Sequence, residues 1–277
     1  MSTTKLQMTP EMESLKTKLK ATWESGDFGK IAESFTGGAA EFVERLNLKP
    51  GMRVLDVACG SGNQSIPAAQ TGAVVTGVDI APNLIEQARK RAETDGLEIR
   101  FDEGDAENLT YRDAEFDVVM TMFGAMFAPR PERVSAELLR VCRPGGVIAM
   151  ANWTSTGFIG QMFKIVGSHV PPPPNMPSPL LWGNETEVRE RLGDGISEIN
   201  FKTRLISFTF PFGVPETIEF WLKFYGPTHK AFAALDEKKQ AALRRDLENL
   251  WAENNFSDDD TTHIRSEYME VTAVRGK

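Results

Sequence analysis

The sequence predicts an α/β fold in which a mostly parallel sheet is covered by helices on both faces. Two runs carry this prediction. An apolar run ends in a carboxylate and two close glycines at Val54–Asn63, and a second apolar run ends in an acid at Ala73–Asp79. Strand-like and helix-like segments then alternate as far as Trp153. Such alternation implies right-handed crossovers, which make neighbouring strands parallel.

The first run predicts a buried strand that turns into a ligand-binding loop. Gly60 and Gly62 allow a positive φ and a close approach of the backbone to a ligand. The segment Asn63–Gln70 can begin a helix whose free N–H groups face the same point. Pro67 is tolerated near the start of that helix, where its missing N–H would have no partner anyway.

The carboxylate of Asp56 indicates which cofactor the loop binds. A buried carboxylate repels the pyrophosphate of a dinucleotide, and Ser65 stands where a G-x-G-x-x-G motif has its third glycine. S-adenosylmethionine carries no phosphate. Its sulfonium and ammonium groups suit a nearby carboxylate, and its own carboxylate suits a helix N-terminus. The loop therefore favours S-adenosylmethionine over a nicotinamide dinucleotide.

The second run and the segments after it extend the sheet. Asp79 follows Gly60 by nineteen residues, at a point where an acid reaches both hydroxyls of a ribose. Pro82 then opens a helix. We predict helices at Asn83–Ala92 and Glu132–Arg143 and further strands at Leu97–Phe101, Phe116–Met120 and Val147–Trp153.

Residues 25–153 resemble a class I S-adenosylmethionine-dependent methyltransferase of the group that includes the ubiquinone/menaquinone-biosynthesis enzymes. The resemblance rests on five segments in the family's order: VLDVACGSGN, VTGVDIAPNLIEQAR, GDAENL, FDVVMTMFG and ELLRVCRPGGVIAMANW. It implies a Rossmann-like fold with a seven-stranded, mostly parallel sheet, and transfer of a methyl group from S-adenosylmethionine.

The resemblance also implies roles for individual residues. The acidic glycine loop would hold the methionine part of the cofactor; its residues are Asp56, Ala58, Gly60, Ser61, Gly62 and Asn63. Asp79 would bind the ribose, with Ile80 packed on the adenine, and Asp105 with Ala106 would read the adenine. The stretch from Thr121 to Phe123 would line the methyl-donor side. Ala58 stands where the family often has glycine, and its small methyl group is expected to leave cofactor binding intact.

The N-terminal segment predicts a helical cap over residues 1–46, in front of a methyltransferase domain at 47–277. Thr9-Pro10 caps and opens an amphipathic helix that extends to about Ser25, and a second helix is predicted from Lys30 to Leu46. In the family such helices close over cofactor and acceptor.

The C-terminal part predicts two more strands that enclose a helical insertion. The predicted elements are helices at Gly157–Val170, Glu185–Leu192, Pro215–Tyr225 and Glu237–Trp251, and strands at Phe201–Phe210 and Tyr268–Val274. The insertion, at about 214–256, is expected to act as a lid.

The aromatic residues after the fourth and fifth strands and in the insertion favour a hydrophobic acceptor. The predicted acceptor pocket consists of Phe123, Met126, Phe127, Trp153, Phe158, Trp221, Phe224 and Tyr225. The alternative is that over half of them are ordinary core residues. Phe123, Phe127 and Trp153 are the strongest candidates. His229 lies near Tyr225 and is the candidate general base, although a lone histidine is more often structural.

Composition narrows the class of protein. A net charge of −8 without a basic tract argues against a nucleic-acid partner. Two cysteines without a C-x-x-C or a His/Cys cluster argue against a disulfide framework and a metal site. No apolar run approaches membrane-spanning length and the first residues do not form a signal peptide, so a cytoplasmic protein is expected. The sequence is compatible with a homo-oligomer.

These observations favour one function over two alternatives. The first is transfer of a methyl group from S-adenosylmethionine to an O, S, N or C atom of a small, hydrophobic or aromatic molecule. The second is methylation of a protein or an RNA, which the acidic charge disfavours. The third is cofactor binding on the same fold without turnover.

Overall fold

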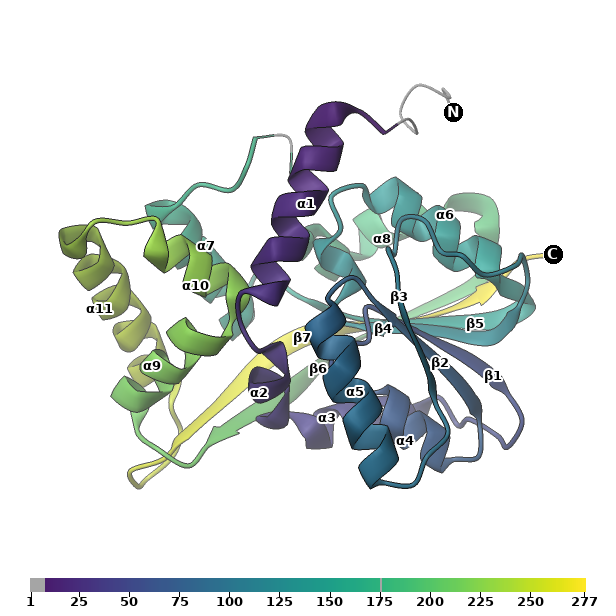
Figure 1. The fold of residues 1–277 in the computed structure, drawn as a ribbon, viewed down its shortest axis with the longest axis horizontal. Helices are drawn as coiled ribbons and strands as arrows, with labels where there is room; N and C mark the ends of the chain where they lie inside the picture. Colours follow the sequence, from purple (N-terminus) through teal and green to yellow (C-terminus); the bar gives the residue numbers. More distant parts are fainter. Residues whose placement is uncertain (1–7, 175) are drawn as a thin grey trace.

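A computed structural model describes residues 8–174 and 176–277 and contains one seven-stranded sheet in the order β3-β2-β1-β4-β5-β7-β6 (Figure 1). The strands are β1 (Arg53–Val57), β2 (Val74–Asp79), β3 (Arg100–Glu103), β4 (Phe116–Met122), β5 (Cys142–Trp153), β6 (Ile196–Phe210) and β7 (Thr262–Arg275). Strands β1 to β5 pair in parallel, whereas β7 runs antiparallel to both β5 and β6. The predicted mostly parallel sheet is confirmed.

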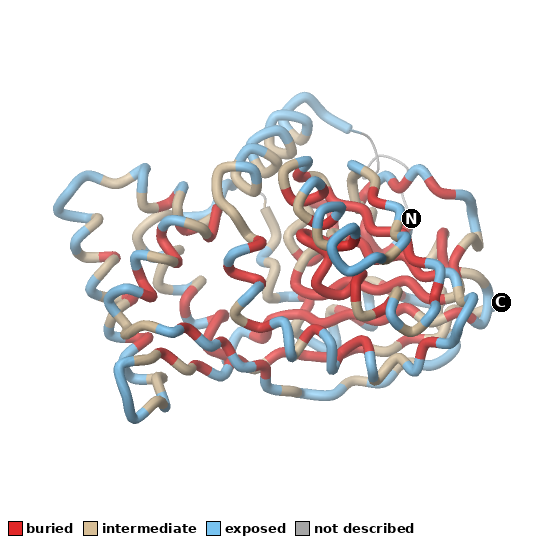
Figure 2. The backbone as a smooth tube through the Cα atoms, turned by 60° about the horizontal axis from the view of Figure 1, so that its bottom comes forward, coloured by how far each residue is buried: buried red, intermediate tan, exposed pale blue. Residues whose placement is uncertain are grey.

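Helices cover both faces of the sheet. One face carries α3 (Thr36–Arg45), α4 (Ser65–Gln70) and α5 (Pro82–Thr94), and the other carries α6 (Pro131–Val141) and α8 (Glu185–Leu192) (Figure 1). The buried residues concentrate in the central strands (Figure 2). Among the described residues no helix is both long enough and apolar enough to cross a membrane.

The strand order fixes where a ligand binds. The chain leaves β1 toward β2 and β3 on one side and later adds β4 and β5 on the other side. In open α/β sheets the crevice outside the carboxyl ends of the strands at such a switch point is the usual ligand site. Here those ends are Val57 of β1, Asp79 of β2 and Met122 of β4.

The N-terminal cap contains three helices. The first, α1 (Pro10–Glu24), begins as predicted, because the Thr9 hydroxyl accepts a hydrogen bond from the Met12 N–H at 3.3 Å. The first seven residues of the predicted cap lie outside the described residues. The prediction of one helix from Lys30 to Leu46 is wrong. The structure has α2 (Phe28–Glu33) and α3, separated at residues 34 and 35.

The break between α2 and α3 has a local cause. The Ser34 hydroxyl donates to the Ile31 carbonyl at 2.6 Å, and such a side-chain bond competes with the helix ladder. Ser34's own carbonyl accepts from the N–H of Thr209 on β6 at 3.1 Å. The break therefore joins the cap to an edge strand.

The third strand begins three residues later than predicted from Leu97–Phe101. The Leu97 N–H donates to the Ala92 carbonyl at 2.9 Å, and Gly96 has a φ of 65°. Leu97 thus closes the end of α5, and pairing with β2 starts only at Arg100. Four other predicted strands occur but are longer than expected: β4 extends to Met122, β5 starts at Cys142, and β6 and β7 start at Ile196 and Thr262.

The segment between β6 and β7 forms three helices rather than the predicted two. They are α9 (Val214–Phe224), α10 (Gly226–Ala233) and α11 (Glu237–Asn254), and with α7 (Phe158–His169) they gather at one end of the long β6–β7 ribbon (Figure 1). Fully buried Trp251 of α11 packs edge-on against Phe158 and against Trp221 of α9. The insertion therefore shares the hydrophobic core of the sheet.

Two glycines allow close contact between the C-terminal end of α1 and the insertion. A Cβ on Gly226 would collide with the carbonyl oxygen of Thr22, and a Cβ on Gly26 would collide with that of Phe224. The Asp27 N–H donates to the same Phe224 carbonyl at 2.9 Å. The C-terminal end of α1 is thereby held by backbone contact at the junction of α9 and α10.

Candidate active site

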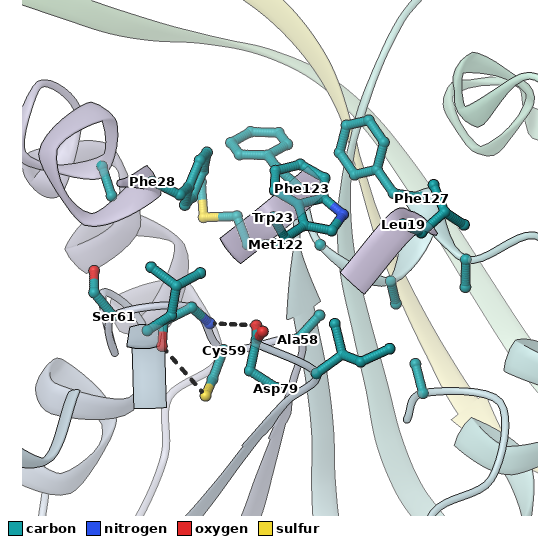
Figure 3. A pocket seen from close by; sticks show the side chains of 18 of the residues that line it. Leu19, Trp23, Phe28, Ala58, Cys59, Ser61, Asp79, Met122, Phe123 and Phe127 are labelled. Atoms are coloured by element: carbon teal, nitrogen blue, oxygen red, sulfur yellow. Dashed lines mark hydrogen bonds between the residues drawn. The ribbon is translucent and has the colours of Figure 1, made fainter. Parts of the chain in front are cut away.

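A large cavity lies at the carboxyl ends of β1, β2 and β4 and encloses about 960 Å³ of empty space, its open mouth included. One end is polar and is lined by Gly60, Ser61, Asp79 and Asp105. The other end is aromatic; its rings are Trp23, Phe28, Phe35, Phe123 and Phe127 (Figure 3). A cavity lined in this way suits a small molecule or cofactor.

The loop after β1 has the backbone that its glycines predict. Gly60 and Gly62 have φ values of 54° and 84°, and Ala58 also has a positive φ of 57°. That conformation explains why glycine suits position 58. The methyl group of Ala58 is accommodated because residue 124 is glycine, since a Cβ there would lie 2.6 Å from the Cβ of Ala58.

Asp79 lines the cavity and also holds the loop. One carboxylate oxygen accepts a hydrogen bond from the Gly60 N–H at 2.8 Å, and the other accepts from the Ala81 N–H at 2.9 Å (Figure 3). Burial raises the pKa of this carboxyl group. The two backbone donors fix the orientation of the carboxylate at the polar end of the cavity.

Asp56 lies behind the loop and does not line the cavity. Its Oδ2 accepts a hydrogen bond from the Ser65 hydroxyl at 2.6 Å, and its Oδ1 has no hydrogen-bond partner among the described residues. The side chain is fully buried. A buried acidic group beside the loop suits a cationic ligand and opposes a phosphate. These residues therefore fit S-adenosylmethionine.

The pH dependence of stability is expected to report on Asp56. Burial raises its pKa from 3.8 to about 7, so the native protein holds this proton more tightly than the unfolded chain does. The free energy of unfolding should therefore fall as the pH rises from about 4 to about 7, by on the order of 4 kcal/mol. Asp56→Asn should flatten that slope in urea unfolding across this range. An unchanged slope would contradict the prediction, and exposed Asp95→Asn is the control.

A cluster of ion pairs holds α1 over the polar end of the large cavity. Lys16 of α1 pairs with Asp105 and lies 2.7 Å from Glu107. Fully buried Glu107 also accepts hydrogen bonds from the backbone N–H and the Nε of Arg130, both at 2.7 Å. Ala106 lies between the two acids and lines the cavity. The sequence analysis missed Lys16, Glu107 and Arg130, although Glu107 lies within the GDAENL segment.

Removal of the Lys16 charge is expected to loosen α1. Lys16→Met leaves Asp105 and Glu107 with one cation fewer, and no residue of α1 is fully buried, so packing holds mainly the C-terminal end of the helix around Trp23. Hydrogen exchange of the α1 amides should speed up about tenfold, which corresponds to about 1.4 kcal/mol. Exposed Lys18 is the matched control, and Lys18→Met should leave the exchange unchanged. Equal protection in both variants would refute the assigned role.

The aromatic end is organised around Phe123, which directly follows β4. Its φ is 56°, an uncommon value for a bulky residue, and its N–H donates to the Ala151 carbonyl at 2.8 Å. Its ring stacks on Trp153 with the centroids 3.5 Å apart and 7° between the planes. Strained backbone of this kind persists where the surroundings determine it, and it clusters at functional sites.

A smaller cavity adjoins the aromatic end and encloses about 280 Å³ of empty space, space open to solvent included. It shares Phe28, Phe35, Phe123 and Phe127 with the large cavity. Its remaining lining residues are Ile31, Trp153, Ile159, Phe208, Trp221 and Tyr225. The structure thus brings together five of the predicted acceptor residues: Phe123, Phe127, Trp153, Trp221 and Tyr225.

Comparison with known proteins identifies the family. Residues 55–150 match the family model described as a methyltransferase domain. An uncharacterized protein of Mycobacterium tuberculosis is 35% identical over 268 residues, which cover 96% of this chain and 97% of that protein. Methyltransferase GfsG of Streptomyces halstedii is 38% identical over 139 residues, 49% of this chain and 50% of that protein. The chain belongs to the class I S-adenosylmethionine-dependent methyltransferases.

The fold of this methyltransferase is also found in solved structures. Phosphoethanolamine N-methyltransferase 2 of Haemonchus contortus, in complex with S-adenosyl-L-methionine, aligns with a TM-score of 0.55 and 19% identity over 87% of this chain and 53% of that chain. S-adenosylmethionine is the cofactor of the family and of this methyltransferase. The narrower grouping with ubiquinone and menaquinone enzymes stays a prediction.

Most of the predicted cofactor residues of this methyltransferase lie around the large cavity. Those that line it are Ala58, Gly60, Ser61, Asn63, Asp79, Ile80, Asp105, Ala106 and Phe123. Asp56, Gly62 and Thr121 line neither cavity. The Thr121 hydroxyl accepts from the Ala125 N–H at 3.1 Å and so shapes the turn after β4.

Three predicted acceptor residues of the methyltransferase and the predicted base lie outside both cavities. Met126 is buried, Phe158 packs on Trp251, and Phe224 packs on Phe220. His229 lies on the unpredicted helix α10, with Nδ1 3.1 Å from the Leu222 carbonyl. His229 lines neither cavity because α10 turns the imidazole toward the backbone of α9, and its role as general base stays a prediction.

Proposed function

We propose that this methyltransferase transfers the methyl group of S-adenosylmethionine to a small molecule with an apolar, aromatic body. The observation that carries the proposal is the continuity of the two ends of the large cavity. Residues assigned to the cofactor lie at the polar end, and the rings of Trp23, Phe28 and Phe127 line the other end together with Phe123. An acceptor next to the methyl group would meet aromatic surface.

The cofactor roles follow from the residues that line the polar end. Asp79 binds the ribose hydroxyls, and Asp105 with Ala106 contacts the adenine next to Ile80. The loop from Ala58 to Asn63 holds the methionine part. Asp56 lies behind the loop, where its carboxyl group attracts the sulfonium and ammonium groups of the cofactor.

Methyl transfer from S-adenosylmethionine needs few ionisable side chains. Bound S-adenosylmethionine supplies a methyl group on a positively charged sulfur, which an acceptor atom attacks in line. The rings around the aromatic end align the acceptor and exclude water. No histidine lines either cavity, so alignment carries the rate rather than a histidine base.

Helix α1 and the insertion act as the two walls of the acceptor site. Trp23 of α1 packs edge-on against Phe127 with the centroids 5.1 Å apart, and against Tyr225 at 6.0 Å. These contacts support an enclosed site for a small acceptor rather than an open surface for a macromolecule. The net charge of −8 likewise disfavours an RNA acceptor.

Incubation with labelled S-adenosylmethionine and a mixed pool of phenols, quinones, thiols and amines tests the proposal. We expect S-adenosylhomocysteine to accumulate with at least one aromatic acceptor and in the absence of protein or RNA. Accumulation only after a protein or an RNA is added would overturn the proposal. Binding without turnover under either condition would instead favour a non-catalytic cofactor-binding protein.

A further inference from the structure

The small cavity is lined by residues that carry few polar side-chain atoms. Trp153, Trp221 and Tyr225 carry the polar side-chain atoms, and the other lining residues are phenylalanine and isoleucine. Trp221 is 2% exposed and its indole N–H has no hydrogen-bond partner among the described residues. Tyr225 is 4% exposed, and no hydrogen bond joins its hydroxyl to another described residue, although that oxygen, unlike the Trp221 nitrogen, is not fully enclosed. A buried donor without a partner, such as the Trp221 N–H, calls for an explanation.

The two groups belong to one turn of the insertion. Trp221 lies in α9 and Tyr225 follows the last residue of that helix, so they are four residues apart on one face. Their ring centroids are 5.0 Å apart. Leaving a buried donor unpaired destabilises the free protein, and a bound hydrogen-bond acceptor would compensate for that cost.

The chemistry of the lining selects the kind of ligand. An indole N–H only donates, and burial raises the pKa of Tyr225, which keeps its hydroxyl protonated and able to donate. No charged side chain lines the small cavity among the described residues. An ammonium group would meet the π faces of the rings, but no carboxylate would balance its charge there, and the Trp221 and Tyr225 donors would oppose it. A carbonyl or hydroxyl oxygen would find donors.

We propose that Trp221 and Tyr225 recognise an oxygen atom on an uncharged aromatic acceptor and so determine the specificity of the methyltransferase. This inference rests on the proposed function and deepens it. The apolar body of the acceptor lies against the four rings that both cavities share, Phe28, Phe35, Phe123 and Phe127. Its oxygen accepts hydrogen bonds from the Trp221 N–H and the Tyr225 O–H at the insertion side.

Three probes of nearly equal shape test the proposal. 1-Indanone carries a carbonyl oxygen, indane lacks it, and 2-aminoindane is a cation at neutral pH. In ligand-observed NMR titrations with S-adenosylhomocysteine present, 1-indanone should bind the wild-type protein about three- to tenfold more tightly than indane. 2-Aminoindane should bind more weakly than indane. Tyr225→Phe and Trp221→Phe should each reduce the preference for 1-indanone and leave the affinity for indane unchanged.

Two matched variants control for the loss of a hydroxyl or an indole elsewhere. Tyr111 and Trp182 are buried and line neither cavity, so Tyr111→Phe and Trp182→Phe should keep the wild-type preference for 1-indanone. A second measurement needs no ligand. Because the Tyr225 hydroxyl has no partner in the described structure, Tyr225→Phe should melt at the wild-type temperature or above it.

The outcomes separate this inference from the proposed function. Equal affinities of the wild-type protein for 1-indanone and indane, or tighter binding of 2-aminoindane, would overturn the oxygen subsite even if small aromatic acceptors are methylated. A marked fall in the melting temperature of Tyr225→Phe would also overturn it, because the hydroxyl would then have a partner within the protein. Turnover that requires a macromolecule would overturn the proposed function itself.

Discussion

Asp79→Ala is expected to weaken the binding of S-adenosylmethionine by about 1–3 kcal/mol, or about 5- to 150-fold. Two losses add up at this position. The carboxylate that lines the polar end of the cavity disappears, and the Gly60 and Ala81 N–H groups lose their acceptor, so the loop after β1 is less firmly held. Isothermal titration calorimetry measures the effect directly.

Two further variants make the Asp79 result specific. Asp79→Asn keeps the size of the side chain and one carbonyl oxygen, so it should retain part of the affinity that Asp79→Ala loses. Asp95→Ala removes an exposed carboxylate at the end of α5 and should leave the affinity unchanged. Wild-type affinity in a folded Asp79→Ala protein would remove the ribose assignment.

Phe123→Ala is expected to destabilise the protein by about 3–5 kcal/mol, the usual cost of truncating a buried phenylalanine. The ring stacks on Trp153 and meets Phe35 and Tyr268 edge-on, at centroid distances of 6.2 and 5.4 Å. Alanine does not relieve the positive φ at this position, because it also carries a Cβ. Chemical denaturation followed by tryptophan fluorescence measures the loss.

The milder Phe123→Leu separates stability from turnover. Leucine keeps most of the packing but lacks the flat face next to the acceptor, so turnover should fall about tenfold or more while cofactor affinity holds. Phe116→Leu is the matched control, since Phe116 is equally buried against Tyr111 and lines neither cavity. Equal turnover in the two leucine variants would show that Phe123 contributes packing alone.

The sequence predicted the part of the site that is encoded locally. The loop from Ala58 to Asn63 and the acid at Asp79 each follow an apolar strand directly, so strand order and spacing were enough to bring them to one edge of the sheet. The structure places these residues around one cavity. Asp56 was predicted to contact the cofactor and instead lies behind the loop, because the direction of a side chain within a strand depends on packing that spacing does not encode.

Contacts between distant segments escaped prediction. Lys16 lies 89 residues from Asp105 in the chain, and nothing in either segment indicates the pairing. Trp23, Phe28 and Phe35 line the cavity from the cap, and they escaped prediction because Trp23 lies in α1, Phe28 begins α2 and Phe35 precedes α3. The place of His229 away from both cavities escaped prediction for the same reason, since its direction depends on a short helix that packing creates after Tyr225.

The position of α1 has a kinetic consequence. The same helix carries Lys16 at the polar end of the large cavity and Trp23 beside Tyr225 of the small cavity, and its C-terminal end is held at Gly226. One movement of α1 therefore uncovers both the donor and the acceptor sites. Because one movement opens both sites, we expect donor and acceptor to enter in either order. In steady-state inhibition, S-adenosylhomocysteine should then compete with S-adenosylmethionine and act noncompetitively toward the acceptor.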